Sequence, residues 1–146
     1  SISGKWVCCR EYYYSGRDED SQKTDTEYAD DLEKWLAGIK PTKIIIDPSA
    51  ASFIAELKKR GYRIKKAKNA VLDGIRFVAS LLNEGKIAIH ESCINTIKEF
   101  ASYTWDISAS EKGEDKPIKM HDHAMDAVRY FCYTIIRKTN GISVLK

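Results

Sequence analysis

The chain has 146 residues, of which 43% are hydrophobic and 31% are charged, and its formal net charge is +3. This composition excludes a wholly disordered or fibrous protein, and the length suits one domain that buries a core without disulfides or a structural metal. No apolar run approaches the ~20 residues of a membrane span, and the first ten residues contain no secretory signal. The four cysteines have no metal-binding spacing, so free thiols in a reducing compartment are expected at Cys8, Cys9, Cys93 and Cys132.

Positive charge is concentrated in the middle of the chain. Residues 41–90 carry ten basic and four acidic side chains, whereas residues 1–40 carry six and nine. The densest stretch runs over residues 58–68 and contains Lys58, Lys59, Arg60, Arg63, Lys65, Lys66 and Lys68. Such a segment can follow a phosphate backbone and is therefore a candidate DNA-binding surface. The alternative is a solvated helix end followed by an edge strand whose lysines discourage aggregation.

The first half of the chain predicts alternating strands and helices. Residues 5–14 alternate and are rich in aromatics, which indicates a strand, and a polar loop follows. Thr24 to Glu27 have the form of a capping box, and the helix that begins there is expected to stop at Gly38 and Pro41. The pattern then predicts a buried parallel strand at 43–46, a helix at 49–60 and a strand at 62–66.

The second half continues this alternation. The predicted elements are a helix over 70–84, a strand over 86–90, a helix over 91–103, a hairpin within 105–119 and a helix over 121–137. The expected core stripe of the last helix is Ala124, Ala127, Val128, Phe131 and Ile135. The order of elements predicts an α/β domain with a mixed β-sheet flanked by helices, and residues 1–146 are interpreted as a single domain.

An aspartate follows the most apolar predicted strand. Asp47 comes directly after Ile44 to Ile46, at the carboxyl end of that strand, which is the edge of an open α/β sheet where ligands bind. The alternative is that Asp47 only caps the next helix, with Pro48 in its first turn. On the motif alone the capping role is the favoured one.

A second group of titratable residues lies at the predicted start of the last helix. At about 100° per residue, Asp122 and Asp126 lie about 40° apart on the helix surface, and His123 lies about 60° from Asp126. Asp126 is on the side that continues as Tyr130 and Tyr133, whereas a plainly solvated face usually carries lysine or glutamate. We therefore expect Asp126 to face a covered or occupied cleft rather than open solvent.

Clustered carboxylates need a compensating cation. Oxygen ligands favour Mg²⁺ or Mn²⁺, and two such ions can activate a water and stabilise a leaving oxygen in phosphodiester cleavage. Asp47, Asp126 and His123 are thus consistent with a two-metal nuclease site. One further bridging acid would normally be required.

Three segments resemble the nuclease domain of tailed-phage large terminase subunits. Residues 46–53 with 57–61 resemble the central motif of that family, residues 71–76 resemble a further segment, and residues 122–130 closely resemble its carboxy-terminal motif. The resemblance spans residues 5–135 and preserves the order of the motifs.

This resemblance implies a ribonuclease H-like fold and a metal-dependent endonuclease that cuts concatemeric viral DNA during packaging, in the cytoplasm of the bacterial host. It implies Asp47 and Asp126 as catalytic, metal-binding acids with His123 beside them, two Mg²⁺ or Mn²⁺ ions, and Asp122 as a cap, a supporting group or an alternate ligand. The implied partners are double-stranded viral DNA and, in the full-length protein, the portal protein and the small terminase subunit. The isolated domain is expected to be monomeric and away from membranes.

The start of the chain departs from the family pattern. The first acid of the family lies on the first strand of the sheet, but no acid precedes Glu11 here. We therefore expect the first strand, and the ATPase part of a larger ATPase–nuclease protein, to be missing from this sequence, which would leave the metal site incomplete and the fragment inactive. No G-x-x-x-x-G-K-[ST] motif is present, so no ATP site is expected.

Two other interpretations stay open on the sequence. One is another ribonuclease H-like phosphotransferase, of the resolvase or transposase type, which would have the same arrangement of three metal-binding acids. The block at residues 122–130 favours a terminase. The other is a non-catalytic module that docks on DNA or on a portal ring through its basic segment. Metal-dependent plasmid nicking separates this second alternative from a nuclease.

Overall fold

The computed structural model describes residues 4–14, 22–110 and 123–142. Its elements follow the predicted alternation: β1 (Trp6–Cys8), α1 (Asp25–Leu36), β2 (Ile44–Ile46), α2 (Ala51–Lys59), β3 (Ile64–Lys66), α3 (Val71–Asn83), β4 (Ile87–Ile89), α4 (Ile94–Ser110), α5 (His123–Phe131), the π-helical segment η1 (Cys132–Ile136) and α6 (Arg137–Ile142). The described strands form two parallel pairs, β1 with β4 and β2 with β3. The predicted α/β class is thereby confirmed.

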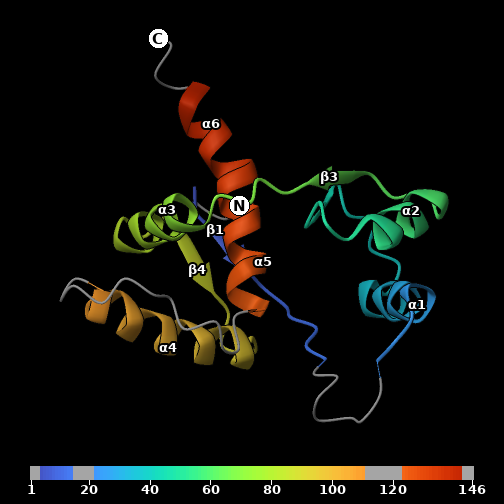
Figure 1. Cartoon of the computed structure of the whole chain (residues 1–146), viewed down its shortest axis with the longest axis horizontal. Coiled ribbons are helices and arrows are strands. Elements are labelled where there is room, and N and C mark those ends of the chain that lie inside the picture. Colours follow the sequence, from blue (N-terminus) through green and yellow to red (C-terminus); the bar gives the residue numbers. More distant parts are fainter. Residues whose placement is uncertain (1–3, 15–21, 111–122, 143–146) are drawn as a thin grey trace.

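A continuous helical rod of α5, η1 and α6 stands between the two strand pairs. Figure 1 shows β1, β4, α3 and α4 on one side of this rod and β2, β3, α1 and α2 on the other. The rod contacts both halves, since α5 touches α3 and α4 as well as β2. The start of the rod is therefore placed where residues from both strand pairs can reach it.

The half that carries Asp47 is a β2–α2–β3 unit. Ile44 pairs in register with Ile64 and Ile46 with Lys66, and the pairing is extended by the Ala67 N–H, which donates to the Ile46 carbonyl at 2.8 Å. The crossover helix α2 packs on α1, and the two helices bury Ala29, Leu36, Ile54 and Leu57. This packing fixes the direction of β2 and hence the position of its carboxyl end.

The larger core lies between α3 and the rod. Val78, Leu81, Cys132 and Ile136 form its buried centre, and partly buried apolar side chains from β1, β4 and α4 surround them. Trp6 of β1 meets Phe131 edge to face, with ring centroids 5.3 Å apart. In the described part of the chain, no helix combines the length and the apolar character needed to cross a membrane.

Two predicted elements differ from the structure. The strand expected over 5–14 is regular only over Trp6–Cys8, because residues 9–14 run on without a partner strand in the described part of the chain. The hairpin expected within 105–119 is wrong over residues 105–110, which continue α4 as a helix. Its centre, at residues 112–115, lies outside the described residues.

The predicted core stripe of the last helix is also partly wrong. Ala127 is exposed, whereas the buried residues are Met125, Arg129, Cys132, Tyr133, Thr134 and Ile136. From Cys132 onward the reason is η1, because a π-helical segment rotates the face that follows it. Before η1, the packing of α5 on α3 and α4 buries Met125 and leaves Ala127 exposed. Burial of Arg129 has a different cause, which lies in the candidate site.

Candidate active site

Asp47 lies at the carboxyl end of β2, as predicted. Its Oδ1 accepts hydrogen bonds from the backbone N–H of Ser49, at 2.8 Å, and from the Ser49 hydroxyl, at 2.7 Å. These bonds close an Asx turn rather than cap α2, whose N-cap residue Ala50 has no side-chain cap. The capping role considered from the sequence is therefore not the one that the structure records.

The other oxygen of Asp47 is held by α5. The Tyr130 hydroxyl donates a hydrogen bond to Oδ2 of Asp47 at 2.5 Å, across 83 residues of sequence. This bond, followed by the two bonds from Ser49 and the positive charge of Arg129, holds the pKa of Asp47 below its ordinary value of 3.8. Burial, together with the bond to Asp47, raises the pKa of Tyr130 to about 12. Asp47 is thus an ionised carboxylate near neutral pH.

Asp126 occupies the same face of α5 as Tyr130, four residues earlier. Its Oδ1 accepts a hydrogen bond from Nη2 of Arg129 at 2.9 Å, and its side chain is 35% exposed. The guanidinium carbon of Arg129 lies 4.7 Å from the centre of the Tyr130 ring. Asp47 and Asp126 are therefore connected through two adjacent residues, Tyr130 and Arg129, and the charges of both acids contribute to the raised pKa of Tyr130.

The other residues of the predicted cluster are His123 and Asp122. His123 is the first residue of α5, its side chain is exposed, and no hydrogen bond or ion pair joins it to another described residue. Asp122 lies outside the described residues. The start of α5 thus presents His123 towards solvent, one turn before Asp126.

Two acids that were not singled out from the sequence hold the helices around the site. The buried Glu99 of α4 accepts hydrogen bonds from the backbone N–H of Met125, at 2.9 Å, and from the Tyr13 hydroxyl, at 3.1 Å, so it anchors the first turn of α5. Glu11 does the same for α4, because its carboxylate accepts bonds from the backbone and side chains of Asn95 and Thr96, at 2.8–3.3 Å. No local motif marks either contact, since the partners are 26 to 86 residues apart.

The chemistry of these donors suits a hard divalent cation. Asp47 and Asp126 supply carboxylate oxygens, the ligands that Mg²⁺ and Mn²⁺ prefer, and both acids carry a group that orients them. Within residues 4–14, 22–110 and 123–142, no group of three or more histidine, cysteine or acidic side chains is gathered tightly enough to hold a metal. The donor set therefore fits the predicted ion in kind and lacks one acid among the described residues.

The basic segment separates into two environments. Lys65 of β3 lies among other cations. Its burial, followed by the charges of Lys138, Lys43 and Lys68, lowers its pKa. Lys43 precedes β2 and Lys138 belongs to α6, so this lysine cluster joins three parts of the fold. Lys58, Lys59 and Lys66 are exposed.

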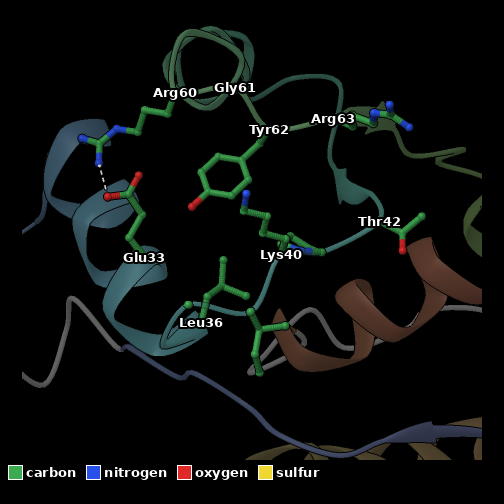
Figure 2. A pocket seen from close by; sticks show the side chains of 11 residues that line it. Glu33, Leu36, Lys40, Thr42, Arg60, Gly61, Tyr62 and Arg63 are labelled. Carbon is green, nitrogen blue, oxygen red and sulfur yellow. Dashed lines mark ion pairs between the residues drawn. The ribbon is translucent and has the colours of Figure 1, made fainter.

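Arg60, also a predicted DNA-binding residue, is engaged by acids. It forms ion pairs with Asp30, at 2.8 Å, Glu56, at 2.9 Å, and Glu33, at 3.3 Å. Figure 2 shows Arg60 turned towards Glu33 at the rim of a hollow of about 560 Å³, into which Tyr62 projects. This hollow lies at the amino ends of β2 and β3, the opposite end from Asp47. Arg60 therefore ties α2 to α1 and leaves its charge neutralised.

The parallel βαβ unit, the acid at its strand end and the acid on the closing helix define a ribonuclease H-like domain. Comparison with known proteins agrees: the terminase RNaseH-like domain family matches residues 10–133. The chain belongs to this family. The resemblance expected from the motifs at residues 46–53 with 57–61, 71–76 and 122–130 is thereby confirmed.

Known relatives of this chain are large terminase subunits of phages. It is 30% identical over 130 residues to the large terminase subunit of Escherichia phage T5, and the match covers 86% of this chain and 30% of that protein. It is also similar to the solved large terminase of a thermophilic bacteriophage, with 50% identity and a TM-score of 0.84 over 93% of this chain and 35% of that one. A structure of that terminase with ATP-gamma-S gives 51% identity and a TM-score of 0.83 over 92% of this chain and 35% of that one. The chain thus spans about a third of the length of these relatives.

Proposed function

We propose that this domain is the metal-dependent DNA endonuclease of a phage large terminase subunit, which cuts concatemeric viral DNA during genome packaging in the bacterial host. The observation that carries the proposal is the coupling of Asp47 and Asp126 through Tyr130 and Arg129, in a chain of the terminase RNaseH-like family. In the full-length protein the proposed partners are viral DNA, the portal protein and the small terminase subunit. A resolvase or transposase is disfavoured by the family match.

The proposed division of labour rests on residues of this chain. Asp47 and Asp126 would hold two Mg²⁺ or Mn²⁺ ions, and such ions supply an activated water and charge stabilisation at the leaving oxygen. Ser49 and Tyr130 keep the Asp47 carboxylate ionised and oriented. The exposed His123 can carry a proton between solvent and the scissile phosphate or orient Asp126.

We further propose that the duplex backbone lies along the lysine cluster of Lys43, Lys65, Lys68 and Lys138. Placing four cations together is unfavourable without an anion, and a phosphate backbone relieves that repulsion. The exposed Lys58, Lys59 and Lys66 are proposed as further phosphate contacts, whereas Arg60 does not contribute because three carboxylates already neutralise it. Such contacts position DNA without selecting a sequence.

Plasmid nicking by the protein at its natural length, with Mg²⁺ or Mn²⁺, tests the nuclease proposal. Asp47→Asn and Asp126→Asn each keep the side-chain shape but remove the anionic ligand. Asp126→Asn keeps an oxygen for the bond from Arg129, and Asp47→Asn keeps one of the two acceptor oxygens. We expect each to lower the cleavage rate by more than ~100-fold, beyond what loss of a supporting group costs a metal site. The matched control is Asp73→Asn, on an exposed acid of α3 whose side chain is 69% accessible, and it should cleave like the parent.

The outcome has a clear alternative. If the parent nicks plasmid and Asp126→Asn folds and nicks it equally fast, Asp126 is not a metal ligand and the proposed site is wrong. DNA binding that persists in the absence of any metal-dependent cleavage by the parent would instead identify a docking module.

A further inference from the structure

Arg129 is a buried charge with three fixed partners. It is 5% exposed, and its Nη1 donates hydrogen bonds to Oδ1 of Asn69, at 3.1 Å, and to the carbonyl oxygen of Ala70, at 3.0 Å. Its Nη2 donates to Oδ1 of Asp126 at 2.9 Å. The guanidinium thus spans from the segment that enters α3 to the acid on α5. Burying a charge is unfavourable unless such partners are present, so this arrangement needs a reason.

Helix α3, which packs against α5, leaves room for the aliphatic part of the Arg129 side chain at Gly74. Gly74 lies in the first turn of α3 and is buried, and a Cβ at this position would lie 2.8 Å from Cγ and 2.9 Å from Cδ of Arg129. Its backbone is not in the left-handed region, unlike that of Gly38, Gly61 and Gly85. Since glycine weakens a helix relative to alanine, clearance for Arg129 is the physical reason for glycine here.

We infer that Arg129, seated over Gly74, is the positioning residue of the candidate site: it directs the Asp126 carboxylate and the Tyr130 ring towards Asp47 at the end of β2. The inference rests on the proposed function and deepens it. One face of the guanidinium covers the Tyr130 ring, and the Tyr130 hydroxyl holds Asp47. Movement of Arg129 would therefore displace both the Asp126 carboxylate and the Tyr130 ring, whose hydroxyl holds Asp47.

The competing explanation is that Arg129 only ties α5 to the start of α3. Arg129→Lys separates the two, because lysine keeps the charge but lacks the planar fork whose two nitrogens bond the Ala70 carbonyl and Asp126 separately and whose face covers the Tyr130 ring. Mn²⁺ binding to the protein at its natural length, without DNA, is measured by electron paramagnetic resonance. We expect the half-saturating Mn²⁺ concentration to rise ~10–100-fold in Arg129→Lys, as for loss of a group that orients a ligand. A structural tie alone would lower the unfolding temperature and leave Mn²⁺ affinity unchanged.

Gly74→Ala provides an independent test that keeps Arg129. In the parent it should weaken Mn²⁺ binding ~10-fold or more, because the added Cβ pushes the stem aside. In the parent, Gly74→Ala should lower the unfolding temperature because of the clash. In an Arg129→Ala background the clash is gone, so Gly74→Ala should raise the unfolding temperature by a few degrees through helix propensity. This reversal of sign is specific to contact between the two residues.

Two results would overturn the inference: a folded Arg129→Lys that binds Mn²⁺ as the parent does, or a Gly74→Ala effect of the same sign and size in both backgrounds. Asp126→Asn in the same Mn²⁺ assay distinguishes this failure from that of the proposed function. If Asp126→Asn abolishes binding while Arg129→Lys and Gly74→Ala do not alter it, only the positioning role is refuted. If Asp126→Asn also leaves Mn²⁺ binding intact, the metal site itself is refuted.

Discussion

Tyr130→Phe removes one hydroxyl that joins α5 to the end of β2. The lost bond is a short O–H···O⁻ contact of 2.5 Å to an ionised carboxylate, and both side chains are partly buried. Hydrogen bonds to charged groups contribute about 1.5–3 kcal/mol. Water can still reach Oδ2 of Asp47 in the variant, so we expect the free energy of unfolding to fall by about 1–2 kcal/mol near neutral pH.

The pH dependence of this difference follows from the two pKa values. Asp47 has a folded pKa below its ordinary 3.8, so its contribution is present above about pH 4 and is lost as the pH falls through the folded pKa. Tyr130 has its pKa raised from 10 to about 12, so its contribution is complete below pH 10 and is lost as the pH rises towards 12. The difference between parent and variant should be flat between these limits and should shrink at both ends.

Urea unfolding followed by tryptophan fluorescence, in EDTA and across this pH range, measures the difference. Tyr62→Phe is the matched control, because the hydroxyl of Tyr62 has no hydrogen-bond partner among the described residues. Equal stability of parent and Tyr130→Phe near neutral pH would refute the argument. So would a difference that stays constant into the alkaline range.

Two further predictions concern the helix anchors and the lysine cluster. Burial alone would raise the pKa of Glu11, but its bonds from Asn95 and Thr96 outweigh burial and hold the pKa below 4.5. Glu11→Gln should therefore lower the free energy of unfolding by about 1–2 kcal/mol near pH 7, and by progressively less as the pH falls below 4.5. Replacement of an exposed acid, Glu91→Gln, should be near neutral in the same urea series. Joint replacement of Lys43, Lys65 and Lys138 by glutamine should weaken DNA binding and reduce the salt dependence of the binding constant by up to ~0.9 in slope per lost phosphate contact. Lys86→Gln is the control, and an unchanged slope in the triple variant would contradict the prediction.

Local patterns were sufficient for the features that depend on neighbouring residues. The capping box of α1 forms as predicted, with Thr24 and Glu27 exchanging hydrogen bonds at 2.7 and 3.2 Å. The run of three isoleucines forms β2 and leaves Asp47 at its end, and the described part of the helix predicted over 121–137 is helical from His123 onward. These are consequences of backbone propensity and of side chains within one turn of each other, which a sequence displays directly.

Only the tertiary structure decided how the acids are held. Arg129 looks like an ordinary helix cation in the sequence, yet it is buried because Asn69, Ala70 and Asp126 converge on it and Gly74 leaves space for it. Glu11 caps a helix more than eighty residues away, and Lys65 of β3 feels the charges of Lys43, which precedes β2, and of Lys138 in α6. The physical reason is that burial and electrostatic environment depend on which segments pack together, and hydrophobic periodicity does not specify these pairings across the chain.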